Sequence, residues 1–243
     1  MNKLIMLRHG QSAWNLEGKF TGWIDVPLTS RGEKEARNAG VEMRGAGLTF
    51  DVAFVSVLQR ATKTLELALN ELSLINLPIR RDWRLNERHY GLLQGLNKKE
   101  TVEIHGKDKV HKWRRGYLQR PPQMPSDHPN HPTQNPLYAN ITHLPSGESL
   151  ADTLNRVQEF WHELIVPALL ENKAVLIVAH GNSLRALVKL IENMSEEDIA
   201  EFNIPTGVPI VCEMDVELNL IDRYFLADNK KLEAAIQEVT QQA

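Results

Sequence analysis

Two histidines stand at equivalent places in the sequence, each after an apolar run and each before a glycine. His9 follows the run at 4–7, and His180 follows the run at 174–179. Such runs are typical of buried strands, and in a parallel sheet ligands bind where the carboxyl ends of the strands meet loops and helix N-termini. One imidazole at such a place can act as a nucleophile while the other supplies positive charge or a hydrogen bond to a developing anion.

Two arginines are expected near these histidines. Arg8 directly precedes His9, and Arg60 lies at the start of the helix expected after a strand at 51–56, so both guanidinium groups can reach the same end of the sheet. Gly10 leaves backbone room for the close approach of an anion. Arginine donates in a planar fork that matches phosphate oxygens, which favours a phosphate pocket over a hydrolytic triad. We therefore expect a phosphorylated substrate.

The elements that must position these residues predict an α/β fold. We expect strands at 3–7, 51–56, 174–179 and 208–214, with a hairpin partner at 218–225. We expect helices from 29 to about 47, at 58–72, at 150–170 and at 182–192. Strands that alternate with helices imply right-handed crossovers and a three-layer α/β/α arrangement, with a mainly parallel sheet covered on both faces.

The pattern changes between residues 86 and 145. A charged, helical stretch at 100–116 precedes a segment at 119–145 rich in proline, histidine and asparagine. We expect a single domain over 1–243, with a lid-like insertion at about 86–145 lying over the carboxyl edge of the sheet. The tail at about 227–243 carries a narrow apolar stripe typical of a short docked helix, and a frayed polar terminus is the alternative.

Composition excludes several classes of function. The chain has 243 residues and is 42% hydrophobic, enough for a substantial core. A net charge of -3 and a pI near 6.3 argue against nucleic-acid binding. There is no signal-peptide apolar region and no run near the ~20 residues of a membrane span, so we expect a soluble, cytoplasmic protein. Cys212 is the single cysteine, in an apolar stretch, and we expect a buried, inert thiol.

The segment at 7–15, Leu-Arg-His-Gly-Gln-Ser-Ala-Trp-Asn, resembles the signature of the histidine phosphatase superfamily, and the chain closely resembles the cofactor-dependent phosphoglycerate mutase branch of that superfamily. Further matching blocks extend over nearly all of the chain, at 20–23, 29–32, 56–61, 85–91, 93–98, 113–116, 147–150, 179–189 and 203–209. The blocks around Glu87 and Arg114-Arg115 are specific to the branch. The resemblance implies the phosphoglycerate mutase-like form of the α/β/α fold.

The resemblance implies that His9 is the nucleophile and becomes a phosphohistidine. The residues it places around the transferring phosphoryl group are Arg8, Asn15, Arg60 and His180. Phosphoryl transfer needs positioning and charge stabilisation, which cationic side chains can supply, so no metal is expected. One nitrogen of His9 must be free to attack, and the other should donate to a nearby carbonyl that fixes the tautomer. A protonated His180 would complement the charge of the transition state.

Glu87 is the general acid and base that the resemblance implies, because the acceptor hydroxyl must lose its proton as it attacks the phosphohistidine. The same resemblance assigns substrate contacts to Thr21, Gly22, Tyr90, Lys98, Arg114, Arg115, Gly181 and Asn182. The last two offer backbone donors at a helix N-terminus. His128 and His131 have a spacing that could suggest a metal pair, but their proline-rich context is neither helix nor strand, so we expect no metal there.

The resemblance implies interconversion of 3-phosphoglycerate and 2-phosphoglycerate, in glycolysis and gluconeogenesis, with 2,3-bisphosphoglycerate as the primer. It makes small phosphoglycerates the binding partners and a homodimer the expected assembly. Two alternatives compare with it. A bisphosphoglycerate synthase or phosphatase, or another histidine phosphatase, would use the same phosphohistidine and differ in how it excludes water, and this alternative stays open. A non-catalytic phospholigand-binding module would need His9 or Glu87 replaced, and neither is.

Overall fold

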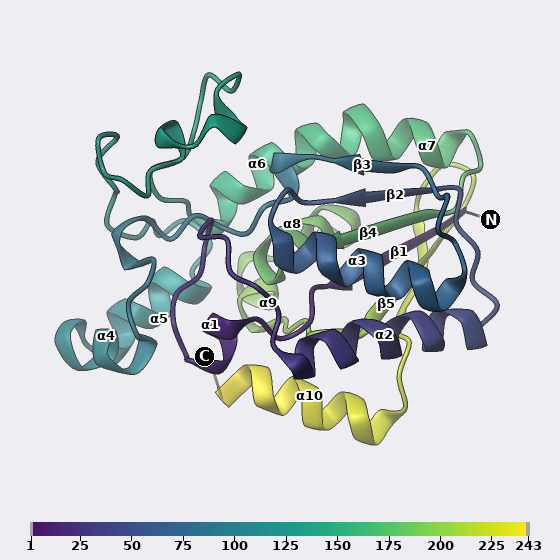
Figure 1. The fold of residues 1–243 in the computed structure, drawn as a ribbon, viewed down its shortest axis with the longest axis horizontal. Coiled ribbons are helices and arrows are strands. Elements are labelled where there is room, and N and C mark those ends of the chain that lie inside the picture. Colours follow the sequence, from purple (N-terminus) through teal and green to yellow (C-terminus); the bar gives the residue numbers. More distant parts are fainter. Residues whose placement is uncertain (1, 242–243) are drawn as a thin grey trace.

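A computed structural model describes residues 2–241 and has a six-stranded sheet at its centre (Figure 1). The strand order is β3-β2-β4-β1-β5-β6. The strands are β1 (Asn2–Arg8), β2 (Val52–Val55), β3 (Ile79–Arg81), β4 (Val175–Ala179), β5 (Pro209–Met214) and β6 (Leu220–Phe225). The first four run parallel, and β5 and β6 add an antiparallel hairpin beside β1. This confirms the mainly parallel sheet. The sequence analysis missed β3, a short, exposed strand with two arginines.

The helices expected from the sequence are present, together with several that were not foreseen. They are α1 (Ala13–Leu16), α2 (Ser30–Gly45), α3 (Gln59–Leu72), α4 (Lys98–His105), α5 (Lys107–Arg115), α6 (Leu150–Phe160), α7 (Val166–Leu170), α8 (Gly181–Glu192), α9 (Glu196–Glu201) and α10 (Asn229–Gln241). The stretch expected at 100–116 divides at Gly106, which has a φ of 84°. The stretch at 150–170 contains a π-turn, Trp161–Ile165, before Pro167, whose missing N–H interrupts the regular ladder.

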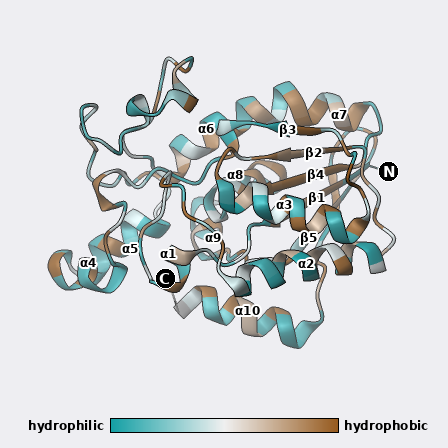
Figure 2. Cartoon of the chain, in the orientation of Figure 1, coloured by the Kyte–Doolittle hydropathy of each residue, from teal (hydrophilic) through white to brown (hydrophobic). Residues whose placement is uncertain are grey.

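The core is built on both faces of the sheet. Alternation along β1 sends Leu4 and Met6 into one cluster, with side chains from α6 and α8, and sends Ile5 and Leu7 into another, with side chains from α2 and α3. Figure 2 shows hydrophobic strands between helices whose other faces are hydrophilic. Within residues 2–241, no helix has the length and apolar character needed to cross a membrane.

The helices cover the two faces of the sheet, so the carboxyl ends of the parallel strands are free to carry the site. In Figure 1 the segment with α4 and α5 lies beyond the carboxyl ends of the parallel strands, and α10 runs alongside α2. The insertion therefore stands at the edge of the sheet where the two histidines were expected. The tail is helical, and its apolar residues are half-buried, as expected for a short docked helix. Cys212 is buried, and burial raises the pKa of its thiol to about 12.

Candidate active site

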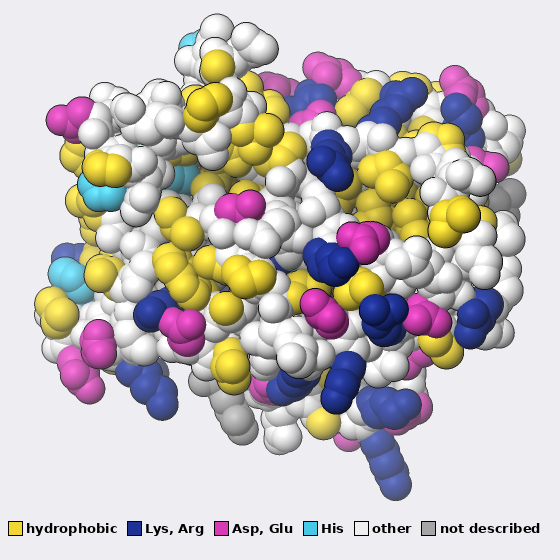
Figure 3. Space-filling model, in the orientation of Figure 1, with side chains coloured by type: hydrophobic (Ala, Val, Ile, Leu, Met, Phe, Trp, Pro, Cys, Tyr) yellow, Lys and Arg dark blue, Asp and Glu magenta, His cyan; other side chains and the backbone are white. Residues whose placement is uncertain are grey.

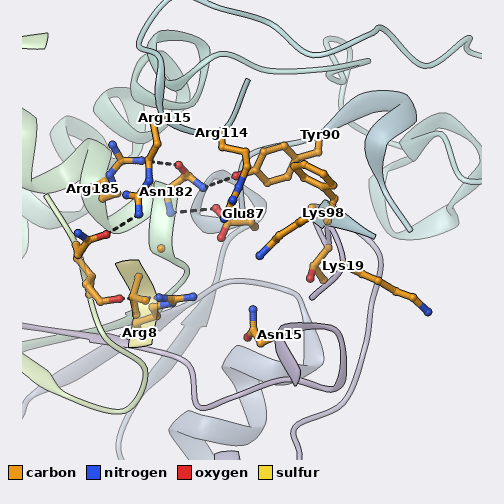
Figure 4. Close-up of a pocket in the computed structure, with 17 residues that line it drawn as sticks. Arg8, Asn15, Lys19, Glu87, Tyr90, Lys98, Arg114, Arg115, Asn182 and Arg185 are labelled. Atoms are coloured by element: carbon orange, nitrogen blue, oxygen red, sulfur yellow. Dashed lines mark hydrogen bonds between the residues drawn. The ribbon is translucent and has the colours of Figure 1, made fainter. Parts of the chain in front are cut away.

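A pocket of about 100 Å³ opens at the carboxyl ends of β1 and β4 (Figure 4). It brings together predicted site residues from distant parts of the chain: Arg8, Asn15, Thr21, Gly22, Glu87, Tyr90, Lys98, Arg114, Arg115, Gly181 and Asn182. Figure 4 shows the side chains of Arg8, Asn15 and Lys98 turned toward one central space below Glu87. The face of the molecule in Figure 3, in contrast, intersperses positive and negative side chains. The pocket thus concentrates cations in a protein of net negative charge.

His9 follows β1 and has only 2% of its surface exposed, and it is not among the residues that line the pocket. Its Nδ1 donates to the carbonyl of Gly10 at 2.7 Å, so the predicted carbonyl partner is confirmed and Nε2 keeps its lone pair. Burial, Arg60 and Arg8 all lower the pKa of His9 well below its ordinary value. The ring is neutral at physiological pH, as a nitrogen nucleophile must be.

His180 lies beside His9, with the two ring centroids 4.9 Å apart and the rings edge to face. Its Nε2 hydrogen-bonds the hydroxyl of Ser56 at 2.6 Å. Burial, Arg60 and His9 lower the pKa of His180 well below its ordinary value. Burial and the cations around it therefore favour the neutral ring, and a protonated His180 stays a prediction that depends on the charge of a transferring phosphoryl group.

The two arginines at this end of the sheet are tied to backbone carbonyls. Arg8 donates from Nη1 to Ile204 at 2.6 Å, and Arg60 donates to Ile24 and Gly22 at 2.9 and 2.7 Å. Within residues 2–241, the buried Nε of each arginine has no partner. A buried donor without an acceptor is costly, and Arg8, which lines the pocket, could donate from Nε to an anion there. Burial lowers the pKa of Arg60 to about 10, which leaves it charged at neutral pH.

Glu87 is fixed by donors from two elements. Its Oε1 accepts from the backbone N–H of Arg88 at 2.8 Å and from that of Asn182, at the start of α8, at 3.0 Å. The side-chain amide of Asn182 in turn donates to the hydroxyl of Tyr90 at 3.1 Å. These bonds place a carboxylate on the pocket wall in a defined orientation.

Three cations of the insertion complete the wall. Lys98 begins α4, and Arg114 and Arg115 end α5. Burial, with Arg114 and Arg8 nearby, lowers the pKa of Lys98 to about 7, and burial lowers that of Arg114 to about 10. Arg115 donates to the side-chain oxygen of Asn203 at 2.6 Å. Like charges held this close are stabilised by an anionic ligand, so the wall suits a carboxylate or a second phosphate.

The pocket also has a lining that the sequence analysis did not assign: Lys19, Phe20, Arg185, Asn203, Ile204 and Val239. Arg185 donates to the side-chain oxygen of Asn182 at 3.0 Å, and burial lowers its pKa to about 9. Arg185 lies three residues after Asn182 on a helix, so both side chains are on one face of that helix. This spacing could have identified Arg185 as a site residue from the sequence. Val239 belongs to α10, which shows that the tail reaches the pocket.

The chain is similar to known proteins over its full length. A 2,3-bisphosphoglycerate-dependent phosphoglycerate mutase from Hydrogenobaculum sp. (strain Y04AAS1) is 52% identical over 244 residues, covering 100% of this chain and 99% of that protein.

Two solved structures share the fold at 21% identity each. A putative alpha-ribazole-5'-P phosphatase from Escherichia coli K-12 has a TM-score of 0.69, covering 93% of this chain and 96% of its own. A mycobacterial glucosyl-3-phosphoglycerate phosphatase also has a TM-score of 0.69, covering 94% and 99%. The family model of the histidine phosphatase superfamily (branch 1) matches residues 4–130 and 122–225, and this chain belongs to that superfamily.

Proposed function

We propose that this protein interconverts 3-phosphoglycerate and 2-phosphoglycerate through a phosphohistidine at His9, primed by 2,3-bisphosphoglycerate. The observation that carries the proposal is the neutral His9 ring, held by Gly10 with Nε2 free, next to a pocket lined with arginines and Lys98. The full-length likeness to a mutase of that name supports the choice of substrate.

In the proposed reaction, Nε2 of His9 attacks phosphorus, an N–P bond forms and the P–O bond to the donor breaks. Glu87 gives a proton to the departing hydroxyl oxygen and takes it back when the next hydroxyl attacks the phosphohistidine. Arg8, Arg60 and Asn15 stabilise the oxygens of the moving group, since such transfer depends on positioning and charge. The negative charge of that group would also favour the protonated form of His180.

The remaining contacts hold the part of the substrate that does not react. Lys98, Arg114 and Arg115 would bind the carboxylate and second phosphate, with Tyr90, Thr21, Gly22, Gly181 and Asn182 supplying neutral donors. The bisphosphorylated intermediate then reorients, and its other phosphoryl group returns to His9. The primer 2,3-bisphosphoglycerate supplies the first phosphoryl group, and the cationic wall and the unpartnered Nε of Arg8 fit such an anion.

A bisphosphoglycerate synthase or phosphatase is the second candidate. It would use the same phosphohistidine, and the position of α10 supports this second function. Val239 of this helix lines the pocket, but no side chain described on the helix is fully buried. A helix docked in this way could open and admit water.

We further propose that the enzyme needs no metal, works in the cytoplasm and forms a homodimer. Analytical ultracentrifugation would measure the mass of the dimer.

The test is an assay of mutase, synthase and phosphatase activities on one preparation. We expect mutase turnover to dominate, to persist in chelator and to collapse without the primer. His9→Ala should give no acid-labile phosphoprotein after incubation with 2,3-bisphosphoglycerate. Loss of activity with the chelator would contradict the metal-independent mechanism, and retained label in the variant would show that another residue is the nucleophile.

A further inference from the structure

A buried ion pair, which the site described above does not include, lies behind Glu87. Arg156, on α6, is 6% exposed, and Glu148, two residues before that helix, is 3% exposed. The guanidinium Nε donates to Oε1 of Glu148 at 2.7 Å, and Nη2 donates to Oε2 at 2.9 Å. This bidentate pair fixes the plane of the guanidinium group.

The other donors of Arg156 all go to the chain segment that leads to Glu87. Its Nη1 donates to the carbonyls of Arg84 and Asn86 at 2.6 and 2.9 Å, and its Nη2 donates to the carbonyl of Glu87 itself at 3.0 Å. The indole Nε1 of Trp23 donates to the same Glu87 carbonyl at 2.6 Å. The backbone on this side of the carboxylate is therefore held at three carbonyls within four residues, those of Arg84, Asn86 and Glu87.

Glu148 holds the segment on the other side. Its Oε2 accepts from the backbone N–H of His89 at 2.7 Å, and its own N–H donates to the carbonyl of His89 at 2.7 Å. Its carbonyl accepts from Nε of Arg88 at 2.6 Å. The ion pair thus hydrogen-bonds the chain both before and after Glu87.

A merely stabilising role is the alternative explanation for such a pair. Burying two charges costs desolvation, and an apolar pair of similar volume is often as stable. The remaining donors and acceptors of this pair, however, all bond to backbone groups around one carboxylate, that of Glu87. The pair therefore sets where that carboxylate lies, which an apolar pair cannot do. We propose that Arg156, oriented by Glu148, is a positioning residue for the general acid and base Glu87. This rests on the role proposed above for Glu87.

The chemistry of the leaving group separates positioning from stability. When His9 attacks 2,3-bisphosphoglycerate, the P–O bond breaks toward an alkoxide, which needs a proton from Glu87. When it attacks p-nitrophenyl phosphate, the bond breaks toward a stable phenolate, which leaves without one. A displaced Glu87 should slow the first reaction and spare the second.

The experiment compares both donors on Arg156→Lys in single-turnover mode, with His9 phosphorylation and p-nitrophenolate release as readouts. We expect about a 10- to 100-fold slower transfer from 2,3-bisphosphoglycerate, because a small misplacement of a catalytic group carries a cost of this size. Release from p-nitrophenyl phosphate should change little. Glu87→Gln should give the same selective loss, and Arg120→Lys, in an exposed ion pair with Asp152 near the same helix, should leave both rates unchanged.

Equal slowing of both donors by Arg156→Lys, or no slowing at all, would overturn the inference. If Glu87→Gln itself shows no selective loss, the proposed role of Glu87 fails instead, which keeps the two failures distinct. If Arg156→Lys does not fold, Trp23→Phe decides, because it removes one donor to the Glu87 carbonyl and keeps an aromatic ring. A smaller loss selective for 2,3-bisphosphoglycerate supports the inference, and an unselective or absent effect overturns it.

Discussion

Burial and neighbouring cations lower the pKa values of the two histidines at the end of the sheet, His9 and His180, and that of Lys98. His9 and His180 were expected side by side because both follow apolar runs, and their rings do lie 4.9 Å apart. The charge on His180 was not predictable, because it depends on burial and on Arg60, which approaches from another helix. The sequence does not single out Arg156 and Glu148 for a similar reason. Apart from each other, their partners are backbone groups, which leave no motif in a sequence.

The protonation state of Lys98 should control substrate binding near neutral pH. A pKa of about 7 means that its ammonium group loses its proton as pH rises through neutrality, and an uncharged amine binds an anionic substrate less well. The kcat/KM for 3-phosphoglycerate should therefore fall above about pH 7. In Lys98→Arg the positive charge persists, so this alkaline limb should move to higher pH. An identical profile in the variant would show that Lys98 does not govern it.

At the scale of elements, periodicity predicted long helices well and short or interrupted ones poorly. Thr29 begins α2 as expected, because its hydroxyl accepts from the N–H of Gly32. The edge strand β3 has one apolar residue among three and so shows no recognisable alternation. The break between α4 and α5 falls at Gly106. The sequence did not predict this break, because the charged residues on both sides of Gly106 read as one continuous helix.

The docking of α10 leads to a second prediction. Arg31, on α2, donates to both carboxylate oxygens of Glu238 and also to Glu35. The other oxygen of Glu35 accepts from the N–H of Gln11, two residues after His9. The Arg31 and Glu238 side chains are exposed, so their ion pair contributes only about 0–1 kcal/mol to the docking of the helix. Glu238→Gln should lower the ratio of mutase to phosphatase turnover by up to about 5-fold.

Deleting the residues beyond Asp228 should lower that ratio further, with mutase turnover falling more than hydrolysis. Glu233→Gln is the matched control, since it removes the same charge from an exposed position on the same helix. Unchanged ratios in both Glu238→Gln and the truncated chain would refute a role for α10 in excluding water.

At the scale of the whole molecule, three buried histidines link stability to pH. Burial lowers the pKa of His89 from 6.5 to about 3, and those of His9 and His180 fall well below 6.5. Below pH 6.5 the unfolded chain takes up protons that the folded chain does not, so acid favours unfolding. Because the two largest core clusters share one sheet, we propose that the chain unfolds as a single domain.

The free energy of unfolding should fall by about 1.4 kcal/mol per pH unit for each such histidine as pH drops below 6.5. For His89 this loss continues down to about pH 3. Urea titrations at pH 7, 6 and 5 would measure the slope. His89→Asn should reduce it, because asparagine can still accept from the N–H of Gly91 but takes up no proton, and the exposed His111→Asn should not. Equal slopes in both variants would contradict this account.

The most direct test of the central claim is rapid-quench trapping of the enzyme during turnover, followed by identification of the phosphorylated residue. We predict an acid-labile phosphoryl group on His9 that forms from 2,3-bisphosphoglycerate and disappears into product at least as fast as steady-state turnover. An unmodified His9 while product accumulates would contradict the account.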